Sequence, residues 1–166
     1  MEAWSNRPFE EANLFNPAFC SMLIAKACKD YNKKASRNLE FSLAFLILPV
    51  VLHPKTRAAL PGTTLTSLLS WAQDKRADLT EFPSHARALE PFTREAMIFG
   101  FANGVLMLDE TGGISPGKSN VEPTKNKTPE FTPEVRDCVD RAGFVGRWFA
   151  GAGMPSTIFS AFGVSP

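Results

Sequence analysis

The sequence is poor in the residues from which most catalytic and metal sites are built. It contains two histidines, His53 and His85, and three cysteines, Cys20, Cys28 and Cys138. Neither histidine has a second histidine, a cysteine or a carboxylate at the spacing of a zinc or iron site, and the cysteines form no CxxC pair. We therefore predict no catalytic residue, no metal and no cofactor. We expect His53 to act as a helix cap or boundary residue and His85 to lie on a solvated face.

Long apolar and charged stretches are also missing. The longest run without a polar side chain, residues 43–52, is far shorter than the about 20 residues that a membrane-spanning helix needs. The 18 basic residues nearly balance the 17 acidic ones, so composition does not favour a polyanionic partner. An odd number of cysteines fits a reducing compartment, and the first residues do not have the pattern of a signal peptide. These points predict a cytoplasmic protein.

What the chain has in excess is phenylalanine, with 14 Phe and 3 Trp against a single Tyr. Such a surplus serves either a densely packed core or surfaces that partners bury. Residues 43–52, LAFLILPVVL, must be buried on every face, because each large apolar side chain left in water costs about 1.5–3 kcal/mol. We expect this stretch to form the central helix, or helix pair, bent at Pro49.

The rest of the chain has the pattern of amphipathic helices. Apolar residues recur at three-four spacing in four long segments: 17–34, 64–77, 79–103 and 132–149. Shorter helices are predicted near residues 4–16, 54–60 and 155–162. In the second long segment the buried stripe is expected to be Leu65, Leu68, Leu69 and Ala72, with Trp71 at its margin. In the third, Pro83 and Pro91 should each open a new helix or a kink. The three cysteines fall on buried faces.

The periodicity changes after Gly104. Val105–Asp109, the turn Glu-Thr-Gly-Gly and Ile114 predict a short β-hairpin, because adjacent glycines supply the positive φ angles of tight turns. Residues 115–131 are predicted to be a polar loop and residues 132–166 a C-terminal helical segment. The predicted fold is mainly α, a single domain over residues 1–166 with a winged-helix-like core and one short β-hairpin.

The winged-helix analogy would make the helix at 64–77 the DNA-recognition helix. Its basic residues, Lys75 and Arg76, stand only at its end, which argues against sequence-specific binding. Weak DNA contact could come instead from three lysines of the polar loop: Lys118, Lys125 and Lys127.

Candidate partner surfaces follow from the distribution of aromatic residues. In the last long helix and the tail, six residues either contact a partner or complete the domain's own core: Phe144, Trp148, Phe149, Ile158, Phe159 and Phe162. A second candidate surface near the N-terminus combines aromatic and charged residues, as interface hot spots do: Trp4, Arg7, Phe9 and Glu10.

Four segments together resemble a known family: NRPFEEANLFNPAF, FLILPVVLHPKTRAALP, TSLLSWAQ and FTREAMIFG. They are similar to the middle component of bacterial three-component ABC systems, a group that includes the small subunit of Lamassu-type anti-phage systems. The resemblance covers nearly the whole chain except the loop at 115–131. It implies a small non-enzymatic subunit beside an SMC-like ABC ATPase and an effector, often a nuclease, in a complex that detects foreign DNA. No catalytic residues are transferred from it.

The predicted function is therefore an accessory subunit that bridges ATPase and effector in antiviral defence and keeps the effector controlled until foreign DNA is sensed. DNA would be contacted indirectly, through the complex. Two alternatives remain open: a free-standing winged-helix DNA-binding regulator, and a small enzyme of unrecognised type.

Overall fold

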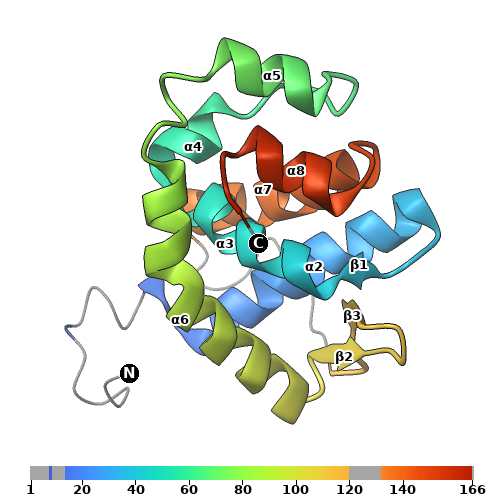
Figure 1. Cartoon of the computed structure of the whole chain (residues 1–166). Helices are drawn as coiled ribbons and strands as arrows, with labels where there is room; N and C mark the ends of the chain where they lie inside the picture. The colour runs from blue at the N-terminus through green and yellow to red at the C-terminus, as the bar shows by residue number, and fades with distance from the viewer. Residues whose placement is uncertain (1–7, 9–13, 120–131, 166) are drawn as a thin grey trace.

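The computed structural model describes residue 8, residues 14–119 and residues 132–165 of the chain. The described chain is mainly helical with a small three-stranded antiparallel sheet, as predicted (Figure 1). Its elements, in chain order, are α2 (Pro17–Ala35), β1 (Leu39–Glu40), the 3₁₀ turn η2 (Phe41–Leu43), α3 (Ala44–Leu52), α4 (Pro54–Ala59), α5 (Leu68–Asp74), α6 (Phe82–Ala102), β2 (Leu106–Leu108), β3 (Gly113–Pro116), α7 (Pro133–Ala150) and α8 (Pro155–Ala161). Within these ranges, every helix is too short or too polar to cross a bilayer.

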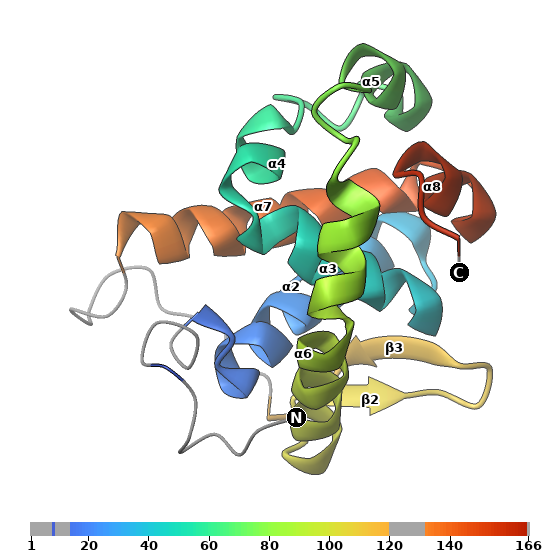
Figure 2. The same ribbon diagram turned by 60° about the vertical axis from the view of Figure 1, so that its left-hand side comes forward.

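Helix α3 occupies the centre of the fold, between α6 on one side and α2 and α7 on the other (Figures 1 and 2). Every residue of α3 except Phe45 is buried. This confirms the prediction of a central core helix. Pro49 lies inside this one helix, so the stretch is not divided into two helices there.

Helices α2 and α7 pack closely along much of their length. Gly146 of α7 faces the backbone of Ala27 on α2 so closely that a Cβ atom at residue 146 would overlap the Ala27 carbonyl. Beside this contact, the buried Asp30 of α2 accepts from Arg147 of α7 and pairs with Lys26 at 3.3 Å. The lack of a side chain at Gly146 therefore allows α2 and α7 to approach this closely.

The sheet has the strand order β1-β3-β2. The hairpin of β2 and β3 was predicted, but β1, which pairs with β3 through Leu39 and Ile114, was not. Asp109 organises the turn, because its Oδ1 accepts from the backbone N–H of Gly113 and from both the N–H and hydroxyl of Thr111. These bonds, and one from Asn38 to Oδ2, hold the pKa of Asp109 well below its usual range.

The predicted stripe of the helix at 64–77 is confirmed at Leu68, which is buried, and at Ala72, which packs against the core, but it is wrong at Leu65 and Leu69. Helix α5 begins only at Leu68; Leu65 is 92% exposed and Leu69 is 49% exposed, whereas Trp71 is 4% exposed. The indole of Trp71 is drawn inward by tertiary contacts, since its Nε1 donates to the carbonyl of Ala59 at 2.8 Å and its ring meets Trp148. The spacing of apolar residues along one helix cannot predict these contacts, because Ala59 and Trp148 lie on other elements.

Helix α6 is continuous over 21 residues. Pro83 lies in its first turn, as predicted, but Pro91 lies inside the helix, on its exposed face, and does not open a second one. In the C-terminal half the buried positions are Thr93, Ala96, Met97 and Gly100, whereas Phe92 and Phe99 are half-buried. Gly100 faces Ser21 of α2 and Leu106 of β2, so the helix is rotated to place its smallest residue at that crossing.

Candidate functional site

The fold brings the two histidines together. The rings of His53, at the N-terminus of α4, and His85, on α6, have centroids 4.4 Å apart. His53 caps α4, as predicted, because its Nδ1 accepts from the backbone N–H of Thr56 at 3.3 Å and lies 2.7 Å from the Thr56 hydroxyl. His85 is half-buried against this ring and does not lie on a fully solvated face. The pair was not predicted, because its members belong to different elements.

The contacts of the histidine pair are those of a helix cap and of ring packing. Burial, and then the neighbouring His85, lower the pKa of His53, while its Nδ1 is already used as the cap. No group of three or more His, Cys, Asp or Glu side chains within residues 14–119 and 132–165 could hold a metal ion. We assign the pair a structural role at the junction of α4 and α6.

The three cysteines lie in the core, as predicted. Burial raises the pKa of the Cys20 thiol to about 12 and also raises that of Cys28. A reactive cysteine needs the opposite shift, because the thiolate is the nucleophile and the metal ligand. These side chains therefore act as small apolar residues.

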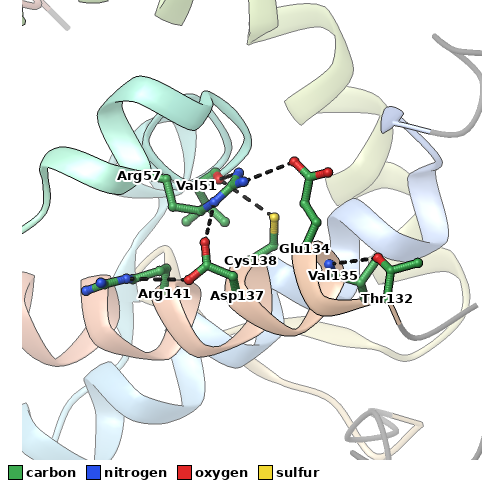
Figure 3. A network of polar contacts seen from close by, with 8 residues as sticks. All are labelled: Val51, Arg57, Thr132, Glu134, Val135, Asp137, Cys138 and Arg141. Atoms are coloured by element: carbon green, nitrogen blue, oxygen red, sulfur yellow. Dashed lines mark hydrogen bonds and ion pairs between the residues drawn. The ribbon is translucent and has the colours of Figure 1, made fainter.

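A polar cluster surrounds Arg57 of α4, which is 7% exposed (Figure 3). Its Nη1 donates to the carbonyl of Val51 at the end of α3, its Nε to Asp137 and its Nη2 to Glu134. Glu134 lies in the first turn of α7, where Thr132 caps the helix, and an acidic residue there is also favoured by the helix dipole. The cluster therefore fixes the N-terminus of α7 against α3 and α4.

A polar hollow lies between the end of α2 and the hairpin. Its donors and acceptors bond one another: Asn32 donates to Asn38 at 2.9 Å, and Asn38 donates to Asp109 at 2.7 Å. Arg37 pairs with Glu40 and stacks on Tyr31. Because these polar groups bond one another, we interpret the hollow as the place where the hairpin of β2 and β3 is attached to the end of α2.

The six interface candidates of the C-terminal segment are buried in the chain itself. Their exposed fractions are 7% for Phe144, 2% for Trp148, 0% for Phe149, 0% for Ile158, 5% for Phe159 and 1% for Phe162. Trp148 packs edge-on against Trp71 at 5.0 Å and donates from Nε1 to the carbonyl of Thr66. Phe162 of the tail meets Phe82 of α6 at 4.7 Å. This placement agrees with the second of the two interpretations, completion of the domain's own core; contact with a partner stays a prediction.

Of the remaining sequence-based candidates, only Lys118 lies among the residues that the structure describes. Six of them lie outside the described residues: Trp4, Arg7, Phe9, Glu10, Lys125 and Lys127. Lys118 is exposed in the turn that follows β3. The hairpin of β2 and β3 follows α6 directly, so α6, and not the segment 64–77, is the helix that precedes it. The exposed basic residues of α6 are Arg87 and Arg94.

A surface cleft that the sequence did not reveal has a volume of about 480 Å³. It lies between η2 and α3, the N-terminal half of α6, and the residues that follow α8. One wall is apolar and includes Phe41, Phe45 and Phe159, whereas the α6 side contributes Arg87 and Arg94. Because the cleft is assembled from segments that range from residue 41 to residue 165, no local pattern could have indicated it.

The fold and this cleft define a small, mainly helical protein with a three-stranded sheet and a candidate interaction site on its surface. The family model of the ABC-three component (ABC-3C) system Middle Component 3 matches residues 4–166, and the chain belongs to this family. It is therefore an accessory middle component of a three-component ABC system. The family-level resemblance found in the sequence is thereby confirmed. No curated protein and no solved structure matches the chain significantly.

Proposed function

We propose that this middle component is a non-enzymatic scaffold that bridges the ABC ATPase and the effector of its system. In this proposal the ATPase is SMC-like and the effector is a nuclease. The middle component keeps the effector inactive until the complex senses foreign DNA, as in Lamassu-type anti-phage defence. The observation that carries the proposal is the family match over residues 4–166.

The surface of the described chain supports a role in assembly. Large apolar side chains stand exposed on separate elements: Leu65 before α5 at 92%, Met154 before α8 at 70% and Ile98 on α6 at 68%. Protein partners bury residues of this kind at the centres of their interfaces. Several such points on different elements suit a subunit that contacts more than one neighbour.

Co-expression tests the bridging role. The tagged ATPase component of the same system would be purified with the effector component, in the presence and in the absence of the middle component. The composition would be measured by light scattering after gel filtration. We expect the effector to be recovered with the ATPase only when the middle component is present. Equal recovery without it would end the bridging proposal.

Nuclease activity, measured with and without the middle component, tests the control of the effector.

A free-standing winged-helix regulator is the second candidate, and the topology is the observation in its favour. A helix and a strand come first, further helices follow, and the closing hairpin pairs with the first strand in the order β1-β3-β2. The charge on α6 argues against it, because Arg94 is paired with Glu90 at 2.8 Å and Ile98 occupies the next turn of the exposed face. Groove-reading helices carry unpaired Arg or Lys to meet phosphates and bases.

DNA binding by the isolated chain separates the two candidates. The scaffold role predicts no measurable binding to a labelled 30-base-pair duplex at about 0.15 M salt, where only proteins with several phosphate contacts bind well. Sequence-selective binding at that salt concentration would instead support the regulator.

A further inference from the structure

We propose that the cleft between η2, α6 and the residues after α8 is the docking site for a segment of a partner component, in which a large apolar side chain stands beside a carboxylate. The inference rests on the proposed function, because the partner is taken to be the ATPase or the effector of the same system. It adds the place of contact and the chemistry of the segment that binds there.

The apolar wall of the cleft is the first observation. Phe45 is the one residue of the central helix α3 that is not buried, and its ring centroid lies 5.8 Å from that of Phe41. Phe41 itself is 39% exposed. Both side chains line the cleft, so apolar surface faces outward at this point. A large apolar side chain of a partner would remove it from water.

The C-terminal wall is held in place by a defined helix ending. Gly163 adopts a left-handed conformation with φ +67°, its N–H donates to the carbonyl of Ser160, and the N–H of Val164 donates to the carbonyl of Phe159 at 3.0 Å. This is the Schellman arrangement, in which the residue after the glycine packs against the last turn of the helix. It sets Val164 beside Phe159 on the wall, so the cleft is a built feature of the fold.

Charge complementarity indicates what the partner segment carries. The charged residues that line the cleft are Arg87, Glu90 and Arg94. Glu90 is bound to Arg94, whose guanidinium also lies over the Phe45 ring at 5.5 Å. Arg87 is exposed and has no ion-pair partner within residues 14–119 and 132–165. One positive charge is therefore left at the rim, and a guanidinium binds a carboxylate through two parallel hydrogen bonds.

Photo-crosslinking in the assembled complex locates the partner segment. Ser165 is exposed at the mouth of the cleft, so it can be replaced by p-benzoyl-L-phenylalanine with little effect on the fold. The matched control places the same amino acid at Ser70, which is exposed on α5 away from the cleft. We expect position 165, and not position 70, to crosslink to one segment of the ATPase or the effector, and mass spectrometry to show a large apolar residue next to Asp or Glu in that segment.

A charge reversal tests the role of the cationic rim. Arg87→Glu should weaken assembly with the crosslinked component by about tenfold or more, as expected for an interfacial charge pair turned repulsive. Arg76→Glu, a reversal at an exposed arginine after α5, should leave the affinity unchanged. Replacing the acidic residue of the crosslinked segment with Lys should restore binding to the Arg87→Glu variant. Thermal unfolding of both variants checks that the fold is intact.

The outcomes separate this inference from the proposed function. If the wild-type chain assembles but Arg87→Glu assembles equally well and positions 165 and 70 crosslink alike, the docking site is wrong and the scaffold role stands. A crosslinked segment without an acidic residue also overturns the inference. If the wild-type chain binds neither component, the proposed function fails and the docking site fails with it.

Discussion

The Nε atom of Arg57 donates to Oδ2 of Asp137 across 2.7 Å, joining α4 to α7 between residues 80 positions apart. Only the arginine is buried: its side chain is 8% exposed, whereas that of Asp137 is 49% exposed. The contact is thus a buried cation reached by carboxylates from the surface, together with the carbonyl of Val51. Removing the Arg57 guanidinium should therefore lower the free energy of unfolding.

Arg57→Met should lower the free energy of unfolding by about 2–3 kcal/mol, because charge-assisted hydrogen bonds are lost and the Val51 carbonyl is left without this donor. The apolar methionine retains much of the packing. Urea unfolding followed by tryptophan fluorescence measures the change. The control is Arg76→Met, at an exposed arginine, which should change the stability by less than about 0.5 kcal/mol. Equal effects of the two substitutions would show that the buried network contributes nothing.

Gly146→Ala should destabilise the chain by about 3 kcal/mol, because the new methyl group would force the backbones of α2 and α7 apart. Gly62 provides the matched control, since no atom lies within 4 Å of a Cβ placed there. Gly62→Ala should leave the melting temperature nearly unchanged. A tolerated Gly146→Ala would mean that α2 and α7 can separate without loss.

Trp148→Ala should cost about 3–5 kcal/mol in the isolated chain, as large-to-small changes at buried aromatic positions do. Trp148→Phe, which keeps a ring but loses the donor to the Thr66 carbonyl, should cost less. Leu65→Ala, at the exposed neighbour of Thr66, should be close to neutral. Chemical denaturation of the isolated chain is the measurement. A Trp148→Ala variant that is fully stable alone but fails to assemble would favour the interface interpretation of this residue.

The cap formed by His53 should make stability depend on pH. Burial, then His85, Lys55 and Arg57 lower the pKa of His53, with Glu81 acting in the opposite direction. A histidine with a lower pKa in the folded chain binds more protons when unfolded, so its contribution is complete above about pH 6.5 and is lost as the pH falls toward the folded pKa.

His53→Asn isolates this effect, because asparagine also caps helices but does not titrate. Between about pH 7 and pH 5, the stability of the wild type should fall more steeply than that of the variant. Unfolding by urea at several pH values in this window compares the two slopes. Parallel curves would show that the protonation of His53 is not coupled to folding.

Local patterns predicted most of the elements. The apolar run at 43–52 leads to a buried helix because it has no face that water could cover. Prolines at the first turns of α2, α4, α7 and α8 mark helix starts, since their missing N–H is not needed there. The Gly-Gly turn located the hairpin, and the three-four spacing placed the cysteines on buried faces.

The same reasoning failed wherever the decisive contact was distant in the chain. Strand β1 has two residues, too few for an alternation pattern, and forms because β3 pairs with it. Trp71 is buried and Leu65 exposed because Ala59 and Trp148 bind the indole. The six C-terminal aromatic and aliphatic residues had two interpretations, and only their packed positions show that they lie in the core of this chain.

The sequence by itself determined the helical class, the central apolar helix and the hairpin, because periodicity, caps and turn residues act over a few positions. Its resemblance to the middle components of three-component ABC systems rests on particular segments, and the family model that matches residues 4–166 shows the membership. Tertiary structure alone decided the bonding of Arg57, the pairing of the histidines, and the cleft with Arg87 at its rim. Each of these joins segments that are far apart in the chain, and their distance in space depends on how the helices pack.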